Sequence, residues 1–461
     1  MIHLEGEEGM PMKFIISETD EILVSHSGLG LVGALLQGTG IQKRSNAIRL
    51  GDRKRPEVSH GDVLTAMIGL LCLGKPDFEA IEAFREDEFF RRSLGLKKVP
   101  SEGTLRQRLD ELEHRCNAIL REESAAMVAR HAPMLTPCYE DWVALDIDPS
   151  PFDNSGTKKE GVSWTYLKFD GYNPWFAYLG NEGYLVHCQL REGSKHCQDG
   201  MPQFLDEAIA YTRQITSARV LVRMDAGHDD LENLRRLRKK PQVDWIIKRN
   251  LRQESEADWL EEAQCHGDWE FPREGKEVYT GETWKERDGH LYRVVFEVIQ
   301  RTITAEGQRL LVPEIEIATF WTSLKLPAKQ VIELYHQHGT SEQFHSEIKS
   351  DMDLERLPSG KFATNALVLS LGQVAYNILR LCGQTSLQQN GQLPTAKRMP
   401  LRKPVARRRL RSVIQDLMYL AARWTRHSHR RGLSFWQNNP WHGIWERLYQ
   451  RFTRRECPAT Q

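Results

Sequence analysis

A chain of 461 residues, of which 40% are hydrophobic and 27% charged, is long enough for about three domains and has the composition of an ordinary globular protein. Its apolar runs are shorter than the ~20 residues that span a membrane, and its amino terminus lacks the basic and apolar regions of a signal peptide. We therefore expect a cytoplasmic protein without a membrane partner. The eight cysteines form no Cys-x2-Cys pair, which disfavours a zinc module and a disulfide framework.

The formal net charge of zero hides a strongly basic carboxyl terminus. Residues 381–461 contain 16 Lys and Arg against three Asp and Glu, whereas the rest of the chain has 47 basic and 60 acidic residues. The basic part is also rich in aromatic residues and includes the run Arg407, Arg408 and Arg409. Because positive charge and aromatic side chains are typical of nucleic-acid binding, we predict a DNA-binding region over residues 386–461. The alternative is a helical appendage whose aromatic side chains pack inward.

Residues 1–135 are predicted to be mostly helical, after a strand-like run at residues 12–16. Asp77 begins a segment whose apolar residues recur at helical spacing, and Ser101 can cap the short basic helix that follows it. Such helices are compatible with a helix-turn-helix that contacts DNA, and also with a plain helical bundle or a dimerisation surface. We therefore assign this region to DNA binding or dimerisation.

Residues 136–249 are predicted to form the first part of an α/β core. Over residues 142–148 apolar and polar side chains alternate, so that Asp146 and Asp148 share one face of a strand. A helix over 201–214 leads to a second β-rich run that ends at Asp225. A helix over 231–239 and a strand over 243–248 complete a βαβ unit. Asp225 then stands at the carboxyl end of a strand, where α/β sheets place their chemistry.

The remaining core is predicted in two pieces. Residues 250–322 are polar and β-rich without helical periodicity, which indicates an insertion of extended structure. Residues 323–385 return to helix as the second part of the core. Pro327 stands at the start of the first helix, Gly339 interrupts it, and Thr340 can cap a new helix that carries Glu342.

Three acidic residues thus stand on separate elements: Asp148, Asp225 and Glu342. Each of these residues alone is weak evidence for a catalytic site, because an acidic residue at a strand end is usually a solvated turn former. Together they favour divalent-metal phosphoryl transfer, because hard cations need carboxylate oxygens that converge from several elements. We predict that all three are catalytic and bind Mg²⁺ or Mn²⁺, with two ions expected.

Four positions near the third acid carry a family resemblance. Tyr335, His338, Glu342 and Lys349 have the spacing Tyr-x2-Arg-x3-Glu-x6-Lys, with histidine in place of the arginine. Residues 145–150 and 222–227 resemble the Asp-x-Asp-x-(Ser/Thr) and Arg-x-Asp-x-Gly motifs of the same class. On these residues the chain resembles bacterial insertion-sequence transposases of the DDE type, over about residues 10–385.

This resemblance implies an α/β fold with an RNase H-like mixed sheet, flanking helices and a β-rich insertion before Glu342. It implies an enzyme that cleaves transposon ends in double-stranded DNA and joins the freed strands to target DNA, with two copies paired as a homodimer. Tyr335, His338 and Lys349 are implied to contact phosphates of the transposon end. Because histidine is mostly neutral at pH 7 and arginine is always charged, the replacement at position 338 predicts a weaker contact.

Two questions stay open from the sequence. Asp146 and Asp148 share a face, and we favour Asp148 as the metal ligand because it directly precedes the Pro149-Ser150 turn. Asp146 would then have a supporting or structural role. The same motifs would also be compatible with a metal-dependent nuclease without strand transfer, or with an inactive DNA-binding protein. A transposase is the interpretation that we favour.

Overall fold

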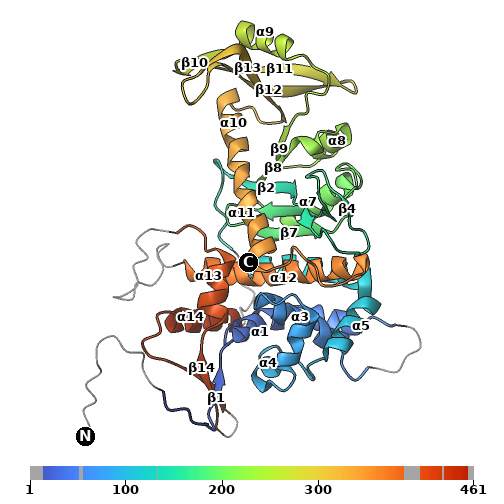
Figure 1. Ribbon diagram of the computed structural model, residues 1–461, viewed down its shortest axis with the longest axis vertical. Helices are drawn as coiled ribbons and strands as arrows, with labels where there is room; N and C mark the ends of the chain where they lie inside the picture. Colours follow the sequence, from blue (N-terminus) through green and yellow to red (C-terminus); the bar gives the residue numbers. More distant parts are fainter. Residues whose placement is uncertain (1–13, 51–55, 132, 389–404, 428–429, 455–461) are drawn as a thin grey trace.

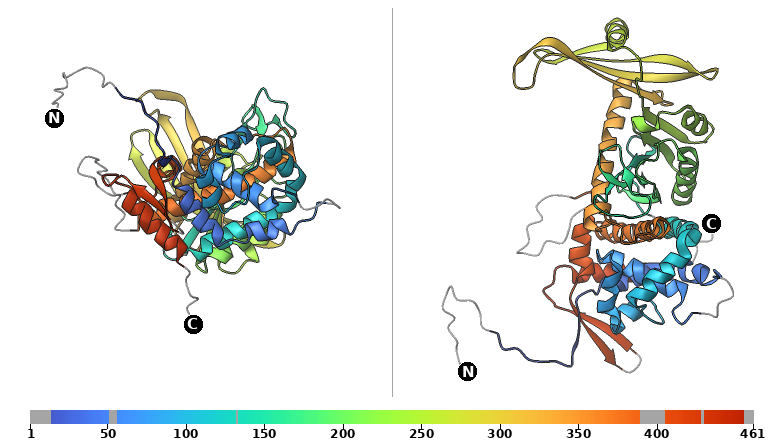
Figure 2. Two further views of the ribbon diagram at one scale, coloured as in Figure 1. Left: turned by 90° about the horizontal axis from the view of Figure 1, so that it is seen from below. Right: turned by 45° about the vertical axis from the view of Figure 1, so that its right-hand side comes forward.

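The computed structural model describes residues 14–50, 56–131, 133–388, 405–427 and 430–454 (Figure 1). The molecule is elongated, and its parts are stacked along the long axis. Helices form the base, the 25-residue helix α12 (Phe362–Ser386) crosses the middle, a central sheet lies above it, and long β-hairpins form the far end. Figure 2 shows the same stacking from another side.

The base contains the helices of the amino-terminal region. They are α1 (Leu29–Gln37), α2 (Ile41–Asn46), α3 (His60–Cys72), α4 (Glu88–Ser93), α5 (Glu102–Leu112) and α6 (Asn117–Arg130), with 3-10 turns η1 (Phe78–Phe84) and η2 (Glu113–Cys116). The side chains of Ser59, Asp87 and Ser101 each accept a hydrogen bond from the backbone N–H three residues later and so begin α3, α4 and α5.

The strand-like run predicted at residues 12–16 was wrong where the structure describes it. Residues 12 and 13 lie outside the described residues, and residues 14–16 belong to an extended, exposed arm. The first strand, β1, is Ile22–Val24. An apolar run becomes a strand only when a partner strand is beside it, and here the arm has none within the described chain.

Helix α12 is the core helix that joins the base to the sheet. It packs against α3 and α6 of the base and against β7 (Tyr184–Gln189) of the sheet. Asn377 and Gln373 bind the backbone of Leu185 in β7, which ties the helix to the sheet. It is the one described helix long and apolar enough to cross a membrane, but 94% of its most apolar window is buried inside the protein. Its apolar length therefore reflects burial in the core.

One nine-stranded sheet runs through the molecule in the order β10-β11-β12-β13-β9-β8-β2-β6-β7. Its central strands, besides β7, are β2 (Trp142–Pro149), β6 (Trp175–Leu179), β8 (Arg219–Met224) and β9 (Val243–Lys248). Strands β2, β8 and β9 are parallel, whereas β6 is antiparallel to both β2 and β7. Helices α7 (Met201–Ile215) and α8 (Leu231–Arg238) lead into β8 and β9. The large mixed sheet and its flanking helices confirm the predicted α/β class.

The pairing of β2 with β8 positions the two strand aspartates. Both strands are apolar and buried along most of their length, as parallel strands covered on two faces usually are. Their register pairs Ile147 with Met224, so that the residues directly after this pair are Asp148 on β2 and Asp225 after β8. These two acids therefore stand at neighbouring carboxyl ends of parallel strands. A small sheet of β3 (Phe152–Asp153), β5 (Asp170–Tyr172) and β4 (Ser163–Trp164) follows directly after β2.

The stretch predicted as an insertion contains one helix and four strands, of which the last three are long. These are α9 (Glu256–His266), β10 (Asp268–Arg273), β11 (Lys276–Arg287), β12 (His290–Ile303) and β13 (Arg309–Thr322). Strand β13 pairs with β9, so the hairpins extend the central sheet. The chain then returns toward α12 through α10 (Ala328–His336), η4 (Gln337–Thr340), α11 (Ser341–Ser346) and the π-helical turn η5 (Glu347–Asp351).

The carboxyl-terminal region folds together with the amino-terminal helices. It contains α13 (Leu410–Val413), the π-helical turn η6 (Ile414–Met418), β14 (Ala422–His427), β15 (Arg430–Phe435) and α14 (His442–Thr453). Strand β14 lies between β1 and β15, and α14 packs on α1. Trp424, Trp441 and Trp445 are buried, so these aromatic side chains pack inward. The described parts of the amino-terminal and carboxyl-terminal regions thus build one unit at the base.

Candidate active site

Asp146 is held by a buried arginine on the neighbouring strand. Arg223 of β8 donates to both carboxylate oxygens of Asp146, from Nε at 2.6 Å and from Nη2 at 2.8 Å. Its Nη1 donates to the carbonyl of Leu334 in α10 at 2.7 Å. Burial alone would raise the pKa of Asp146, but the charges of Arg223 and His338 lower it. Asp146 is therefore ionised and engaged within the protein.

Asp148 lies two residues further along β2 and faces three side chains of the returning helices. His338 Nε2 donates to its Oδ1 at 2.8 Å, and Ser341 Oγ donates to its Oδ2 at 2.7 Å. His345 Nε2 lies 3.9 Å from Oδ2. Burial would raise the pKa of Asp148, but the charge and hydrogen bond of His338, with the contact from His345, hold it well below its ordinary value.

His338 bridges the two aspartates of β2. Its Nδ1 lies 2.9 Å from Asp146 Oδ1, while its Nε2 contacts Asp148. Burial would lower the pKa of His338, but the two carboxylates raise it to about 10, so the ring is protonated and both nitrogens donate. The sequence predicted a phosphate contact for this residue. In the structure both of its donors are already used inside the protein, and a phosphate could be reached only after the ring leaves these carboxylates.

Asp225 begins the turn after β8 and is more open than Asp148. Its side chain is 41% exposed, although its Oδ1 is buried and has no hydrogen-bond partner in the described chain. His228 Nε2 lies 3.5 Å from that oxygen. Desolvation raises the pKa of Asp225, and the charge of nearby Asp148 raises it further against the opposing effect of His228. Two carboxylates that repel each other form a place where a cation would be stabilised.

Glu342 stands on α11 at the rim of this cluster. Ser341 and His345, one helical turn apart, face Asp148, whereas Glu342 is exposed. Its carboxylate forms no hydrogen bond or ion pair with any residue that the structure describes. Across the described residues, no three His, Cys, Asp or Glu side chains gather closely enough to hold a metal ion. The assignment of Glu342 as third ligand stays a prediction.

The two other residues of the helical signature lie on either side of Glu342. Tyr335 in α10 is half-buried, packs its ring 4.6 Å from that of Phe320, and has a raised pKa caused by burial and by the charges of Asp148 and Asp225. Lys349 in η5 lies over the ring of Phe152 at 5.8 Å, with its Nζ 4.0 Å from Glu355. Burial lowers the pKa of Lys349. Of these two residues, Tyr335 is the one close enough to the aspartates for their charges to raise its pKa.

The arginine run of the tail is engaged with acidic residues of the core. Arg407 donates to Glu347 at 2.5 Å and Arg409 to Asp351 at 2.8 Å, so both pair with the π-helical turn η5. Arg408 is only 2% exposed, pairs with Asp416, and stacks over Trp441 at 4.4 Å. Arg408 is therefore a core residue in this structure, and its placement gives no support to the prediction that it contacts DNA.

Sequence reasoning missed three residues that hold Asp148 and Asp146 in place. Arg223 was visible only as part of the Arg-x-Asp-x-Gly motif, with no role assigned to it. Ser341 and His345 lie three and seven residues after His338, a spacing that puts all three on one side of consecutive helical turns. That spacing was the available signal for a polar cluster around Asp148.

Comparison with known proteins shows which family the sequence matches. The sequence matches the family described as "Transposase DDE domain group 1" over residues 13–457. No curated protein matched the sequence. Among solved structures, a chain of "Cryo-EM structure of piggyBac transposase synaptic complex with hairpin DNA" is similar, with 12% sequence identity and a TM-score of 0.41, over 95% of this chain and 83% of that chain. At this TM-score the similarity does not align individual residues.

The family match covers nearly the whole described chain, including both strand aspartates and the helices that face them. Enzymes of this family act on DNA and generally use divalent metal ions. The chain therefore belongs to the Transposase DDE domain group 1 family and is a DDE transposase.

Proposed function

We propose that this transposase cuts double-stranded DNA at the ends of its own mobile element and joins the freed 3′-hydroxyls to target DNA. Asp148, Asp225 and Glu342 would be the catalytic, metal-binding residues. The observation that supports this best is the neighbouring placement of Asp148 and Asp225 at the carboxyl ends of β2 and β8. Glu342 follows Ser341, whose hydroxyl contacts Asp148, so a third carboxylate lies at the rim of the same site.

The residues present fit hard divalent cations. The buried Oδ1 of Asp225 lacks a hydrogen-bond partner in the described chain, and the charge of Asp148 raises the pKa of Asp225. All three proposed ligands offer carboxylate oxygens, the donors that Mg²⁺ and Mn²⁺ prefer. When bound, such ions, of which we expect two, would lower the pKa of the attacking water or hydroxyl and stabilise the leaving oxygen.

The chain's own residues keep the two aspartates of β2 ionised and oriented. His338 and Ser341 fix the carboxylate of Asp148, and Arg223 anchors Asp146 behind it. We propose that Tyr335 and Lys349 contact phosphates near the cleaved strand. We also propose that the largely buried Arg407 and the half-exposed Arg409, both beside η5, contact DNA when they exchange their internal carboxylate partners for phosphates.

We extend the proposal to the class of enzyme. Within the central sheet, the order β7-β6-β2-β8-β9, with β2 antiparallel to β6 and parallel to β8, supports an RNase H-like core. Three of the four identities in the Tyr-x2-Arg-x3-Glu-x6-Lys signature support a bacterial insertion-sequence enzyme that acts in the cytoplasm. Because two transposon ends must be paired, we propose a homodimer in the DNA complex.

The test uses the purified full chain and labelled element ends, whose sequence comes from the inverted repeats that flank the gene. With Mg²⁺ or Mn²⁺ present, we expect nicked ends and joined products. Cleavage without joining would indicate a nuclease, and binding alone would indicate an inactive DNA-binding protein. Either result would overturn the proposed strand transfer.

A further inference from the structure

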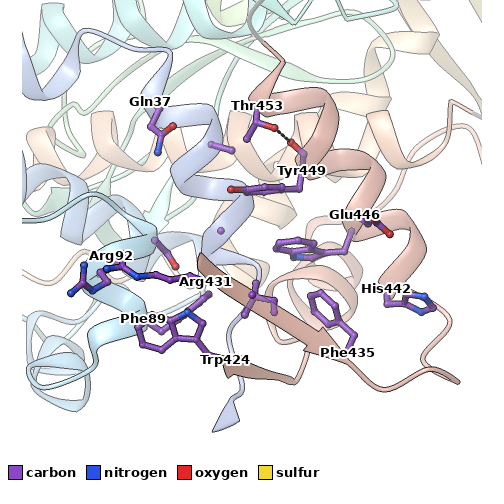
Figure 3. Close-up of a pocket in the computed structure, with 16 residues that line it drawn as sticks. Gln37, Phe89, Arg92, Trp424, Arg431, Phe435, His442, Glu446, Tyr449 and Thr453 are labelled. Carbon is purple, nitrogen blue, oxygen red and sulfur yellow. Dashed lines mark hydrogen bonds between the residues drawn. The ribbon is translucent and has the colours of Figure 1, made fainter. Parts of the chain in front are cut away.

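A pocket of about 530 Å³ opens at the base of the molecule, between described parts of the amino-terminal and carboxyl-terminal regions (Figure 3). We call it the terminal pocket. Its floor is the face of β15 that carries Arg431, Leu433 and Phe435 at alternate positions, together with Trp424 of β14. Its walls come from α1, α4 and α14. This volume is in the range that holds small ligands, and would admit a few large side chains.

One aromatic residue that lines the terminal pocket has a buried hydrogen-bond donor without a partner in the described chain. Trp445 lines it and is 5% exposed, and its indole Nε1 has no hydrogen-bond partner in the described chain. Leaving such a buried N–H unpaired is costly. Tyr449 stacks on Trp445 with ring centroids 5.3 Å apart and is itself 41% exposed. The pocket therefore offers an open aromatic surface, which suits an apolar occupant.

Charged side chains of both signs line the pocket. Arg431 is exposed and forms no ion pair with any described residue, whereas Arg92 pairs with Glu88 of its own helix. His442 and Glu446 line the opposite wall on α14, as Figure 3 shows. An occupant with acidic residues beside its apolar part would complement Arg431.

The chain itself contains a segment with these properties. Phe14, Ile15 and Ile16 form an extended arm and are 80%, 97% and 95% exposed. Three consecutive exposed large apolar residues are unusual unless they have a binding partner. Three acidic residues follow them: Glu18, Asp20 and Glu21, of which Glu21 pairs with Arg423 of its own chain.

The arm is placed to leave its own molecule. It leads into β1 of the three-stranded sheet β1-β14-β15. Because β14 lies in the middle, β1 is at the edge opposite to β15. Both Figure 1 and Figure 2 show the arm running away from the base. Its apolar residues are therefore more readily buried by a second copy than by the pocket of the same chain.

We propose that residues 14–18 of one copy dock in the terminal pocket of a second copy, and that the exchange is reciprocal. In a two-fold dimer each copy places its arm in the pocket of the other copy, so both pockets are filled and both arms are buried. This inference rests on the proposed homodimer and names the surface that builds it. It does not depend on the carboxylate site, which lies in another part of the molecule.

Cross-linking of two distinguishable chains tests the exchange. Ile16→Cys is made in one chain and Thr453→Cys, at the pocket, in another with a different tag, both with Cys265 and Cys457 replaced by serine. After mixing and treatment with a short bifunctional maleimide, we expect a product of doubled mass that carries both tags. The chain with both cysteines distinguishes the alternative, because a cross-link at monomer mass would place the arm in its own pocket and overturn the proposal.

Sedimentation of the full chain gives an independent readout. We expect the Phe14→Ser/Ile16→Ser variant to raise the dimer dissociation constant at least tenfold. The matched control is Leu311→Ser/Val312→Ser, which removes two equally exposed apolar residues from β13 and should leave the constant unchanged. An unaltered dimer in the arm variant would overturn arm exchange while leaving strand transfer and dimerisation through another surface intact.

Discussion

Arg223 on β8 and Asp146 on β2 face each other in register and are joined by two hydrogen bonds of 2.6 and 2.8 Å in the buried centre of the sheet. Asp148, two residues away on the same face, has no arginine partner and is instead held by His338 and Ser341. The two aspartates that the sequence left as alternatives are thus in different environments. Asp146 is bound by the buried Arg223, and Asp148 lies beside Asp225 at the open end of the strands.

We expect Asp146→Ala and Asp148→Ala to fail in different ways. Removing Asp146 leaves the buried Arg223 guanidinium without its counter-charge, which should lower the free energy of unfolding by about 3–5 kcal/mol. Asp148→Ala should cost less stability and abolish DNA cleavage. Urea unfolding followed by circular dichroism, with cleavage assays on the folded fraction, separates the two. Equal losses of stability would contradict the assignment.

The two remaining carboxylates should be needed for chemistry and not for DNA binding. We expect Asp225→Ala and Glu342→Gln to reduce cleavage about a thousandfold, because metal ligation supplies several kcal/mol of transition-state stabilisation. End binding in a gel-shift assay should stay close to that of the wild type, since neither change removes a basic residue. Near-normal cleavage by Glu342→Gln would show that another residue of the helices completes the site.

The strand ends were predictable because they are local features. Alternating apolar residues before Asp148 and a β-rich run before Asp225 indicate strands from short-range periodicity alone, and the structure has β2 and β8 there. The pairing of those strands then brings the acids together. Glu342 was found from the spacing of a signature, and spacing does not determine whether a helical side chain points toward the strands.

The tail could not be predicted in the same way, because its structure depends on contacts that are distant in sequence. In β14, Trp424 pairs with Ile22 of β1, about four hundred residues away in the sequence. No local sequence pattern indicates that β1 is the partner of β14. Likewise, Arg408 belongs to a run of arginines that resembles a DNA-binding surface. Arg408 is buried because it stacks on Trp441 and pairs with Asp416. The number of charged residues in the sequence does not predict either contact.

Replacing His338 should affect catalysis more than DNA affinity. The ring donates to both Asp146 and Asp148, so His338→Ala removes the group that orients the proposed ligand Asp148. We expect cleavage to fall at least tenfold while end binding changes less. His338→Arg restores a cation that can donate to both carboxylates and should recover most of the activity. If His338→Ala weakens end binding and cleavage by the same factor, the residue acts as the phosphate contact that the sequence predicted.

The neighbouring arginines 408 and 409 should separate structure from DNA binding. Arg408→Gln removes a buried cation from Asp416, so we expect a loss of about 3–5 kcal/mol in unfolding free energy. Arg409 is half exposed, and if it contacts a phosphate, Arg409→Gln should reduce the slope of log K against log salt by about 0.9. DNA affinity measured over a range of salt concentrations checks this. An unchanged slope for Arg409→Gln would mean that its pairing with Asp351 is its whole role.

A charge cluster at the insertion should make stability depend on acidity. Glu254 accepts hydrogen bonds from Arg249, Lys285 and the Trp259 indole. Burial would raise the pKa of Glu254, but these three donors outweigh it and lower the pKa to about 2. Because the pKa in the folded protein lies below that of an unfolded glutamate, about 4.3, the cluster stabilises the fold above that pH and loses its effect as the pH falls toward 2.

We therefore expect Glu254→Gln to lower the free energy of unfolding by about 2–3 kcal/mol at pH 7, since a shift of roughly two pKa units corresponds to that energy. The difference from the wild type should shrink steadily as the pH is lowered from 5 toward 2, because the native carboxylate is itself protonated there. Glu261→Gln, an exposed position on the same helix α9, is the control and should show no such dependence. Urea unfolding at several pH values measures both variants. A wild-type advantage that stays constant down to the lowest pH would mean that the cluster contributes through packing, and that the glutamate charge has no part in it.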